Sequence, residues 1–209
     1  MRVITNHPVA VGSLDHLYPE GTMRDNTSSL PFIMEVEKLF GRPISYLDLG
    51  CAGGQMAVDF HFRGHRAVGL EGSDYGIVHG RPNWVRYHNE VLFTCDLTRP
   101  YDIVNEDGDP IVFDLISGWE LFEHIETDDL HSFLCQIKNK MALTGLLVGT
   151  ISSLDILSGY GVYHHRTVKS RQWWLDVLSD YFKVVPYPFK AEVRKEVSEG
   201  TSFLIGATR

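Results

Sequence analysis

Three titratable side chains lie close together in the segment WELFEHI, which spans residues 119–125. Glu120, Glu123 and His124 have the spacing i, i+3 and i+4, so they would share one face if this segment were helical. The segment directly follows an apolar run that has the character of a buried strand. Two carboxylates and an imidazole at the end of a strand suit general acid–base chemistry, a divalent metal, or the capping of the next helix.

A second pair of histidines, His164 and His165, follows a later apolar run at residues 145–152. Loops that follow parallel strands meet at one edge of a sheet, so one of these imidazoles would meet His124 there. Two carboxylates with two imidazoles would hold a divalent metal, and the imidazoles favour manganese, iron or cobalt over magnesium. Without a metal, His124 would act as a general base or as a hydrogen-bond partner of the substrate.

Strands and helices alternate along the chain. We expect strands over residues 44–50, 66–72, 90–96, 111–117 and 145–152, and helices over residues 27–40, 56–62, 128–140 and 170–181. Thr27 or Ser28 is expected to cap the first of these helices. The last residues have the pattern of two strands joined by a turn at residues 199–200. This order predicts one α/β domain, residues 1–209, with a mostly parallel sheet and an antiparallel edge, and residues 1–26 would form a flank or lid.

The composition is that of a globular protein without a strongly basic surface. The chain has 209 residues, of which 44% are hydrophobic and 22% charged, and its formal net charge is −8. Proteins that grip duplex nucleic acid usually neutralise phosphates with Lys and Arg, so this charge argues against a nucleic-acid partner. No apolar run reaches the roughly 18 residues that a membrane span needs. Three widely spaced cysteines suggest no disulfide framework, and we expect a cytoplasmic protein.

Small and acidic residues stand at the ends of the predicted strands. The first strand leads into LDLGCAGG, where the small residues 50–54 would let a ligand approach the backbone closely. The second strand ends in Glu71, a carboxylate that suits the two hydroxyls of a ribose. Asp96 followed by Leu97 after the third strand suits an adenine amine beside an apolar wall. In an open α/β sheet, ligands bind outside these strand ends at the point where the strand order reverses.

This order of motifs resembles the class I S-adenosylmethionine (SAM)-dependent methyltransferases, from about residue 27 to the C-terminus. The resemblance implies a Rossmann-like fold, with a mostly parallel seven-stranded sheet and an antiparallel C-terminal strand. It implies SAM as the cofactor and the following cofactor-binding residues: Asp48, Gly50, Cys51, Ala52, Gly54, Glu71, Gly72, Asp96, Leu97, Ser117 and Trp119. Ala52 departs from the glycine that these proteins often have. The glycine spacing does not fit the G-x-G-x-x-G of a dinucleotide dehydrogenase, which is the alternative cofactor class.

The pattern E-x-x-E-H with a later histidine is similar to two groups of methyltransferases. One group methylates the 2′-oxygen at the 3′ end of small RNAs with the help of a metal. The other comprises the ubiquinone-pathway O-methyltransferases and their small-molecule relatives. This similarity implies Glu120, Glu123, His124 and His165 (or His164) as ligands of a divalent metal, Mn or Mg. The catalytic residues are then expected to be His124, Glu123 and His165.

We therefore expect SAM-dependent O-methylation of a hydroxyl on a small-molecule substrate. Metal-dependent 2′-O-methylation of an RNA 3′ end is the alternative reaction, and the acidic net charge argues against it. A catalytically inactive SAM-binding scaffold that serves a partner enzyme is the alternative from another class. Such a scaffold would keep Gly50 and Glu71 but would have no need of the Glu and His residues together.

Overall fold

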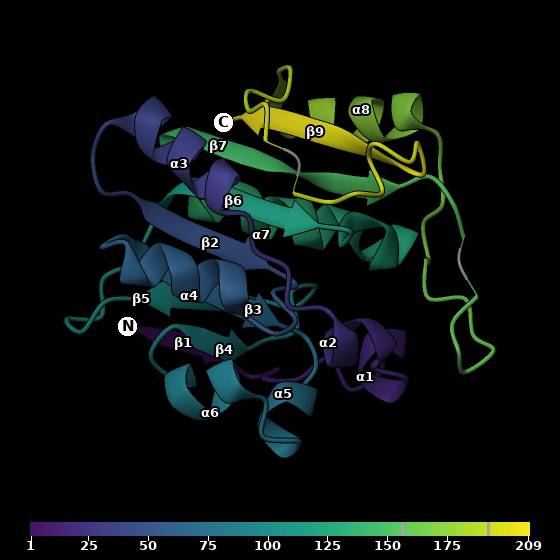
Figure 1. The fold of residues 1–209 in the computed structure, drawn as a ribbon, viewed down its shortest axis with the longest axis horizontal. Coiled ribbons are helices and arrows are strands. Elements are labelled where there is room, and N and C mark those ends of the chain that lie inside the picture. Colours follow the sequence, from purple (N-terminus) through teal and green to yellow (C-terminus); the bar gives the residue numbers. More distant parts are fainter. Residues whose placement is uncertain (156, 192) are drawn as a thin grey trace.

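The fold is built around a seven-stranded sheet (Figure 1). The computed structural model describes residues 1–155, 157–191 and 193–209. The strand order is β4-β3-β2-β6-β7-β9-β8. The strands are β2 (Ser45–Leu49), β3 (Arg66–Glu71), β4 (Leu92–Thr94), β6 (Phe113–Trp119), β7 (Met141–Ser152), β8 (Lys183–Val184) and β9 (Ser202–Thr208). β9 runs antiparallel to both of its neighbours and the other pairs are parallel, so the predicted fold class is confirmed.

Helices cover both faces of the sheet (Figure 1). The helices and 3-10 turns are α1 (Leu14–Leu17), α2 (Glu20–Arg24), α3 (Leu30–Phe40), α4 (Gln55–Phe62), α5 (Tyr75–Val78), α6 (Pro82–Tyr87), η1 (Phe122–His124), η2 (Thr127–Asp129), α7 (Leu130–Lys140) and α8 (Arg171–Ser179). Side chains of a strand alternate between the two faces, so Tyr46 of β2 packs with α3 and α4, whereas Leu47 packs with α7 and α8. Within the described residues, no helix is both long and apolar enough to cross a membrane.

The helix α3 begins later than the sequence pattern suggests. Its N-cap is Ser29, whose hydroxyl accepts a hydrogen bond from the amide of Phe32 at 3.3 Å, so the expected cap at Thr27 or Ser28 is wrong. Ser28 instead donates its hydroxyl to Asp59 of α4 at 2.6 Å. Because this hydrogen bond engages the hydroxyl of Ser28, that hydroxyl does not cap α3, and Ser29 caps the helix instead.

The first residues of the chain form a strand that the sequence pattern did not predict. β1 (Arg2–Thr5) pairs antiparallel with β5 (Tyr101–Val104) as a separate two-stranded sheet. Beyond β1, the chain runs along the carboxyl edge of the main sheet, where the Asp96 amide donates to the carbonyl of His7 at 2.9 Å. Residues within 6–26 contact the strand ends, while residues 2–5 belong to a sheet, and the role of a lid stays a prediction.

The C-terminal strand pair is shorter than expected, and the predicted turn at residues 199–200 does not join two strands directly, because residues 185–191 and 193–201 are not in strands. β8 has only the two residues Lys183 and Val184, because the prolines at 186 and 188 lack the amide that a further ladder would need. Gly200, in the predicted turn before β9, has a positive φ of 75°. Residue 192 of the predicted strand lies outside the described residues.

Candidate active site

The loop from Gly50 to Gly54, here called the glycine loop, joins β2 to α4. Gly50 and Gly54 have φ angles of 65° and 78°, and a Cβ on Gly54 would lie 2.5 Å from a methyl carbon of Leu92. Ala52 also has a positive φ, 45°, although it is not glycine. The position that departs from the usual glycine therefore has the conformation for which glycine is preferred.

Glu71 holds the glycine loop against the end of β3. One carboxylate oxygen accepts the amide of Ala52 at 2.8 Å, and the other accepts the amide of Ser73 at 3.1 Å. The hydroxyl of Thr22, in the covering N-terminal segment, lies 3.5 Å from the same carboxylate. Burial raises the pKa of Glu71, and these donors oppose the shift by stabilising its charge. Glu71 thus lies at the strand end where a ribose is expected.

Asp48 and Ser117 link the two strands at which the strand order reverses. The hydroxyl of Ser117 on β6 donates to Asp48 Oδ1 of β2 at 2.7 Å and lies 2.6 Å from the hydroxyl of Tyr46. Burial raises the pKa of Asp48 to about 7. The ends of β2 and β6 form the topological switch point of the sheet, which is where open α/β sheets bind their ligands.

The other predicted cofactor residues lie along the same edge with protein partners. Asp96 accepts the amide and hydroxyl of Thr98 at 3.0 and 2.7 Å. The carbonyl of Gly72 accepts the amide of Ala10 at 2.8 Å. Cys51, Leu97 and Trp119 are at most 9% exposed and belong to the two hydrophobic cores. Their roles toward SAM stay predictions.

The segment WELFEHI does not form the continuous helix that would align its three titratable groups. Only Phe122–His124 is helical, as the 3-10 turn η1, and Glu120 before it has a positive φ of 53°. This backbone turns Glu120 toward β9, where its carboxylate accepts the hydroxyl of Ser202 at 2.8 Å. The shared face of Glu120, Glu123 and His124 is therefore absent, because the chain leaves β6 through a left-handed residue.

Glu123, in the 3-10 turn η1, is fully buried. Its Oε1 accepts the amide of Ser152 at 2.9 Å, whereas Oε2 has no hydrogen-bond partner among the described residues. Burial raises its pKa to about 7. The backbone carbonyl of Glu123 accepts the amides of Arg166 and Thr167 at 2.7 and 2.9 Å, which brings the loop after β7 against η1.

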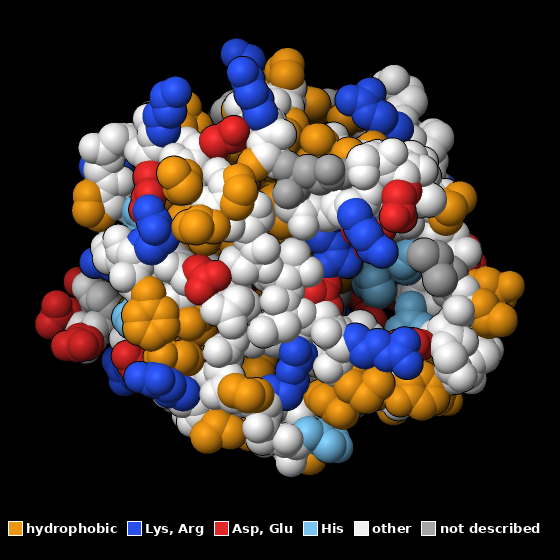
Figure 2. Space-filling view, viewed as in Figure 1, with side chains coloured by type: hydrophobic (Ala, Val, Ile, Leu, Met, Phe, Trp, Pro, Cys, Tyr) orange, Lys and Arg blue, Asp and Glu red, His pale blue; other side chains and the backbone are white. Residues whose placement is uncertain are grey.

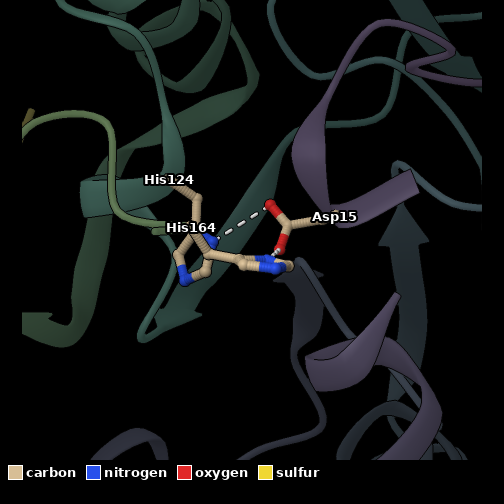
Figure 3. Close-up of side chains that lie close together, drawn as sticks. All are labelled: Asp15, His124 and His164. Carbon is tan, nitrogen blue, oxygen red and sulfur yellow. Dashed lines mark hydrogen bonds and ion pairs between the residues drawn. The ribbon is translucent and has the colours of Figure 1, made fainter. Parts of the chain in front are cut away.

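Asp15 of α1 lies between two imidazoles (Figure 3). Its Oδ2 accepts a hydrogen bond from Nδ1 of His124 at 3.0 Å, and its Oδ1 accepts one from Nδ1 of His164 at 3.2 Å. Burial opposes a charge on His124, yet the Asp15 carboxylate raises its pKa to about 9. Burial also opposes the charge of Asp15, but the two imidazoles hold the pKa of Asp15 well below its ordinary value. These interactions join the N-terminal segment to η1 and to the loop after β7.

His165 completes this group of side chains. Its Nδ1 donates to the carbonyl of Leu154 at 2.5 Å, and its ring centroid lies 4.9 Å from that of His124. Burial and the neighbouring His124 lower the pKa of His165. Asp15, Glu123, His124, His164 and His165 are called the histidine cluster below. Figure 2 shows histidine side chains in a hollow of the surface, with acidic side chains beside them and Lys and Arg on its rim.

In two sets of three residues of the cluster, the possible ligand atoms lie close enough together to bind one metal ion. One nitrogen or oxygen from each of Glu123, His124 and His165 lies within 4.8 Å of the others, and the same holds for Asp15, His124 and His164. The structure thus brings together three of the four predicted ligands and leaves Glu120 outside both sets. Asp15 was not singled out from the sequence, because no motif or spacing connects it with residues more than a hundred positions away.

The chain matches a family model described as a methyltransferase domain over residues 21–192. Its fold is similar to that of a protein from Pyrococcus horikoshii OT3, with 15% identity and a TM-score of 0.60 over 98% of this chain and 96% of that chain. It is similar to that of a SAM-dependent methyltransferase from Clostridium acetobutylicum, with 13% identity and a TM-score of 0.60 over 85% of this chain and 89% of that chain. It is also similar to that of the magnesium protoporphyrin IX methyltransferase of Synechocystis with bound S-adenosylhomocysteine, with 14% identity and a TM-score of 0.56 over 85% of this chain and 80% of that chain. No curated protein matches the sequence. The chain therefore belongs to the methyltransferase domain family, as a class I SAM-dependent methyltransferase.

Proposed function

We propose that the chain methylates a hydroxyl of a small molecule, with a divalent metal ion held by Glu123, His124 and His165. One observation carries the proposal. The Nδ1 atoms of both histidines donate to protein oxygens, which leaves Nε2 of each ring as the nitrogen with a lone pair in the neutral form. The buried oxygen Oε2 of Glu123 has no partner among the described residues. A buried carboxylate oxygen without a donor is costly unless the group takes up a proton or a cation meets it, and the two imidazoles beside Glu123 suit a metal cation.

These three side chains fit a transition-metal ion better than magnesium. Two imidazoles and one carboxylate are a donor set that suits manganese, iron or cobalt, and an ion held by only these three side chains would have further coordination positions for a substrate oxygen. The ion would supply a Lewis acid to the acceptor oxygen, which eases the loss of the hydroxyl proton. SAM supplies a methyl group on a sulfonium, and its transfer to oxygen leaves S-adenosylhomocysteine and one proton.

The chain's own residues position the reactants. The glycine loop, Glu71 and Asp96 would hold SAM at the switch point of the sheet. Glu123 and the two imidazoles would fix the acceptor oxygen beside it, since η1 directly follows β6. Methyl transfer is an in-line displacement, so this fixed placement is the first requirement for the rate.

Exposed tyrosines on the loop that carries His164 and His165 support an acceptor with an aromatic or apolar body. Tyr160 and Tyr163, on the loop after β7, are 51% and 52% exposed. The ring of Tyr18, beside α1, lies 5.8 Å from that of Tyr160, and Glu20 accepts the amide of Gly159 at 2.6 Å. Exposed apolar side chains that gather beside a polar site commonly contact a ligand.

The test is a methyl-transfer assay on EDTA-treated protein with and without added Mn²⁺. Phenols, catechols, aliphatic alcohols and a single-stranded RNA with a free 3′ end are offered, and S-adenosylhomocysteine and the methylated product are measured. We expect an O-methylated phenol or catechol and a loss of turnover of at least about 100-fold without metal. The variants Glu123→Gln and His165→Asn should lose turnover to the same degree, while His88→Asn, at an exposed histidine outside the cluster, should not.

Three results would contradict the proposal. Methylation of nitrogen or carbon, or of the RNA alone, would overturn the acceptor. Full turnover in EDTA would overturn the metal and leave His165 as a general base through its Nε2. Binding of S-adenosylhomocysteine without turnover of any acceptor would favour a SAM-binding scaffold.

A further inference from the structure

The carboxylate of Asp15 contacts an imidazole that the proposed metal site uses, but it comes from a different part of the chain. Asp15 belongs to α1 in the N-terminal segment, whereas His124 follows β6 and His164 follows β7. Both oxygens of Asp15 are engaged, one by Nδ1 of His124 at 3.0 Å and the other by Nδ1 of His164 at 3.2 Å (Figure 3). One carboxylate is thus fixed by two rings from separate segments.

We infer that Asp15 is a positioning residue for the metal site, which aims Nε2 of His124 at the ion, with His164 as the brace that holds Asp15. The inference rests on the proposed function and adds a residue and a segment to it. Histidines that bind metals usually donate their other ring N–H to a carboxylate or a backbone carbonyl, which fixes the ring and raises its basicity. Asp15 plays this part for His124 as the Leu154 carbonyl does for His165.

The three side chains differ in their exposure to solvent. The side chain of His164 is only 8% exposed, and its Nε2 has no partner among the described residues. The side chains of Asp15 and His124 are 28% and 19% exposed, so both remain in partial contact with solvent. The side chain of His164 is thus the most deeply buried of the three, as expected of a brace.

The N-terminal segment that carries Asp15 also reaches the cofactor end. Thr22 of α2 donates to Glu71, and Arg81 donates to the carbonyl of Thr22. Asp15 in α1 and Thr22 in α2 are seven residues apart, so the same short segment contacts the predicted metal ligand and the predicted ribose carboxylate. Movement of this segment would therefore change both sites together.

The experiment is a calorimetric titration of Co²⁺ into EDTA-treated full-length protein, followed in parallel by the visible absorption of the bound ion. The wild type should bind one ion, and Glu123→Gln and His165→Asn should abolish binding. Asp15→Asn should weaken it about 10- to 100-fold with the stoichiometry kept, and Asp15→Ala should weaken it further. Asp107→Asn, at an exposed residue of a distant turn, is the matched control and should bind as the wild type does.

The variants separate this inference from its rivals. If the wild type binds Co²⁺ and Asp15→Asn binds it equally tightly, Asp15 has no positioning role. If Asp15→Asn and His164→Asn abolish binding while His165→Asn does not, then Asp15, His124 and His164 are themselves the ligands. Absence of binding to the wild type would overturn the proposed metal site as well. Thermal unfolding of each variant establishes that a lost ion does not reflect a lost fold.

Discussion

Replacing Asp48 by asparagine should change how the stability of the protein depends on pH. Asp48 is 3% exposed at the end of β2, and burial raises its pKa from 3.8 to about 7. Between these two values the folded protein keeps the proton that the unfolded chain releases. The folded state then binds more protons, so the free energy of unfolding falls as the pH rises through this range. The stability that protonated Asp48 contributes is fully present below its pKa in the unfolded chain, 3.8, and is lost as the pH rises through its pKa in the folded protein, about 7.

The expected magnitude follows from this difference in pKa. The slope is about 1.4 kcal/mol per pH unit for one proton, so the step from pH 5 to pH 7 costs the wild type on the order of 3 kcal/mol. The Asp48→Asn variant lacks this titration but keeps an oxygen that can accept the Ser117 hydroxyl, now 2.7 Å from Asp48 Oδ1. The stability of the variant relative to the wild type should therefore rise by that amount between the two pH values.

Urea unfolding followed by tryptophan fluorescence at pH 5 and pH 7 measures both proteins. Asp114→Asn is the matched control. Burial opposes the charge of Asp114, but hydrogen bonds from Arg42 hold its pKa below the ordinary value, so it is ionised in both states at either pH. That variant should lose the same stability at pH 5 and at pH 7. If the difference between Asp48→Asn and the wild type is also constant, Asp48 titrates as an ordinary carboxyl and the reasoning from burial is refuted.

Two further predictions concern the cofactor edge. Glu71→Ala should weaken the binding of S-adenosylhomocysteine at least about tenfold in calorimetry, because the glycine loop loses the acceptor of the Ala52 amide and the site loses the carboxylate that we expect to bind the ribose. An unchanged affinity would remove Glu71 from the cofactor site. Gly54→Ala should lower the free energy of unfolding by about 2 kcal/mol or more, since φ is 78° and the new Cβ would lie 2.5 Å from Leu92. Gly108→Ala, with φ of 94° and nothing within 4 Å of the Cβ, should cost less, and an equal cost would refute the role of crowding.

The sheet and its cofactor edge were predictable because their signals are local. Each strand and the residue that ends it occupy one short stretch of sequence, so the apolar run before Asp48 and the carboxylate at Glu71 could be recognised without knowing the fold. The expected seven strands, the reversed C-terminal strand and the family are confirmed. The signal for β1 was weaker, because its partner β5 lies about a hundred residues away and only alternate side chains of β1 are half-buried.

The histidine cluster was predictable only in part. The spacing of Glu120, Glu123 and His124 indicates a shared face, but it assumes a helix, and the left-handed backbone at Glu120 prevents one. The approach of His165 follows from the position of its loop after a parallel strand. Asp15 depends on the path of the N-terminal segment across the sheet, which no periodicity or motif in the sequence encodes.

The placement of Asp15 has a consequence for how proteins of this fold diverge. The family model begins at residue 21, so α1 lies outside the region that the model describes. Asp15 nevertheless contacts two histidines that lie inside that region, His124 and His164. Proteins that share the matched region can therefore differ at the position of Asp15, so family membership does not by itself imply the carboxylate that we infer to orient His124.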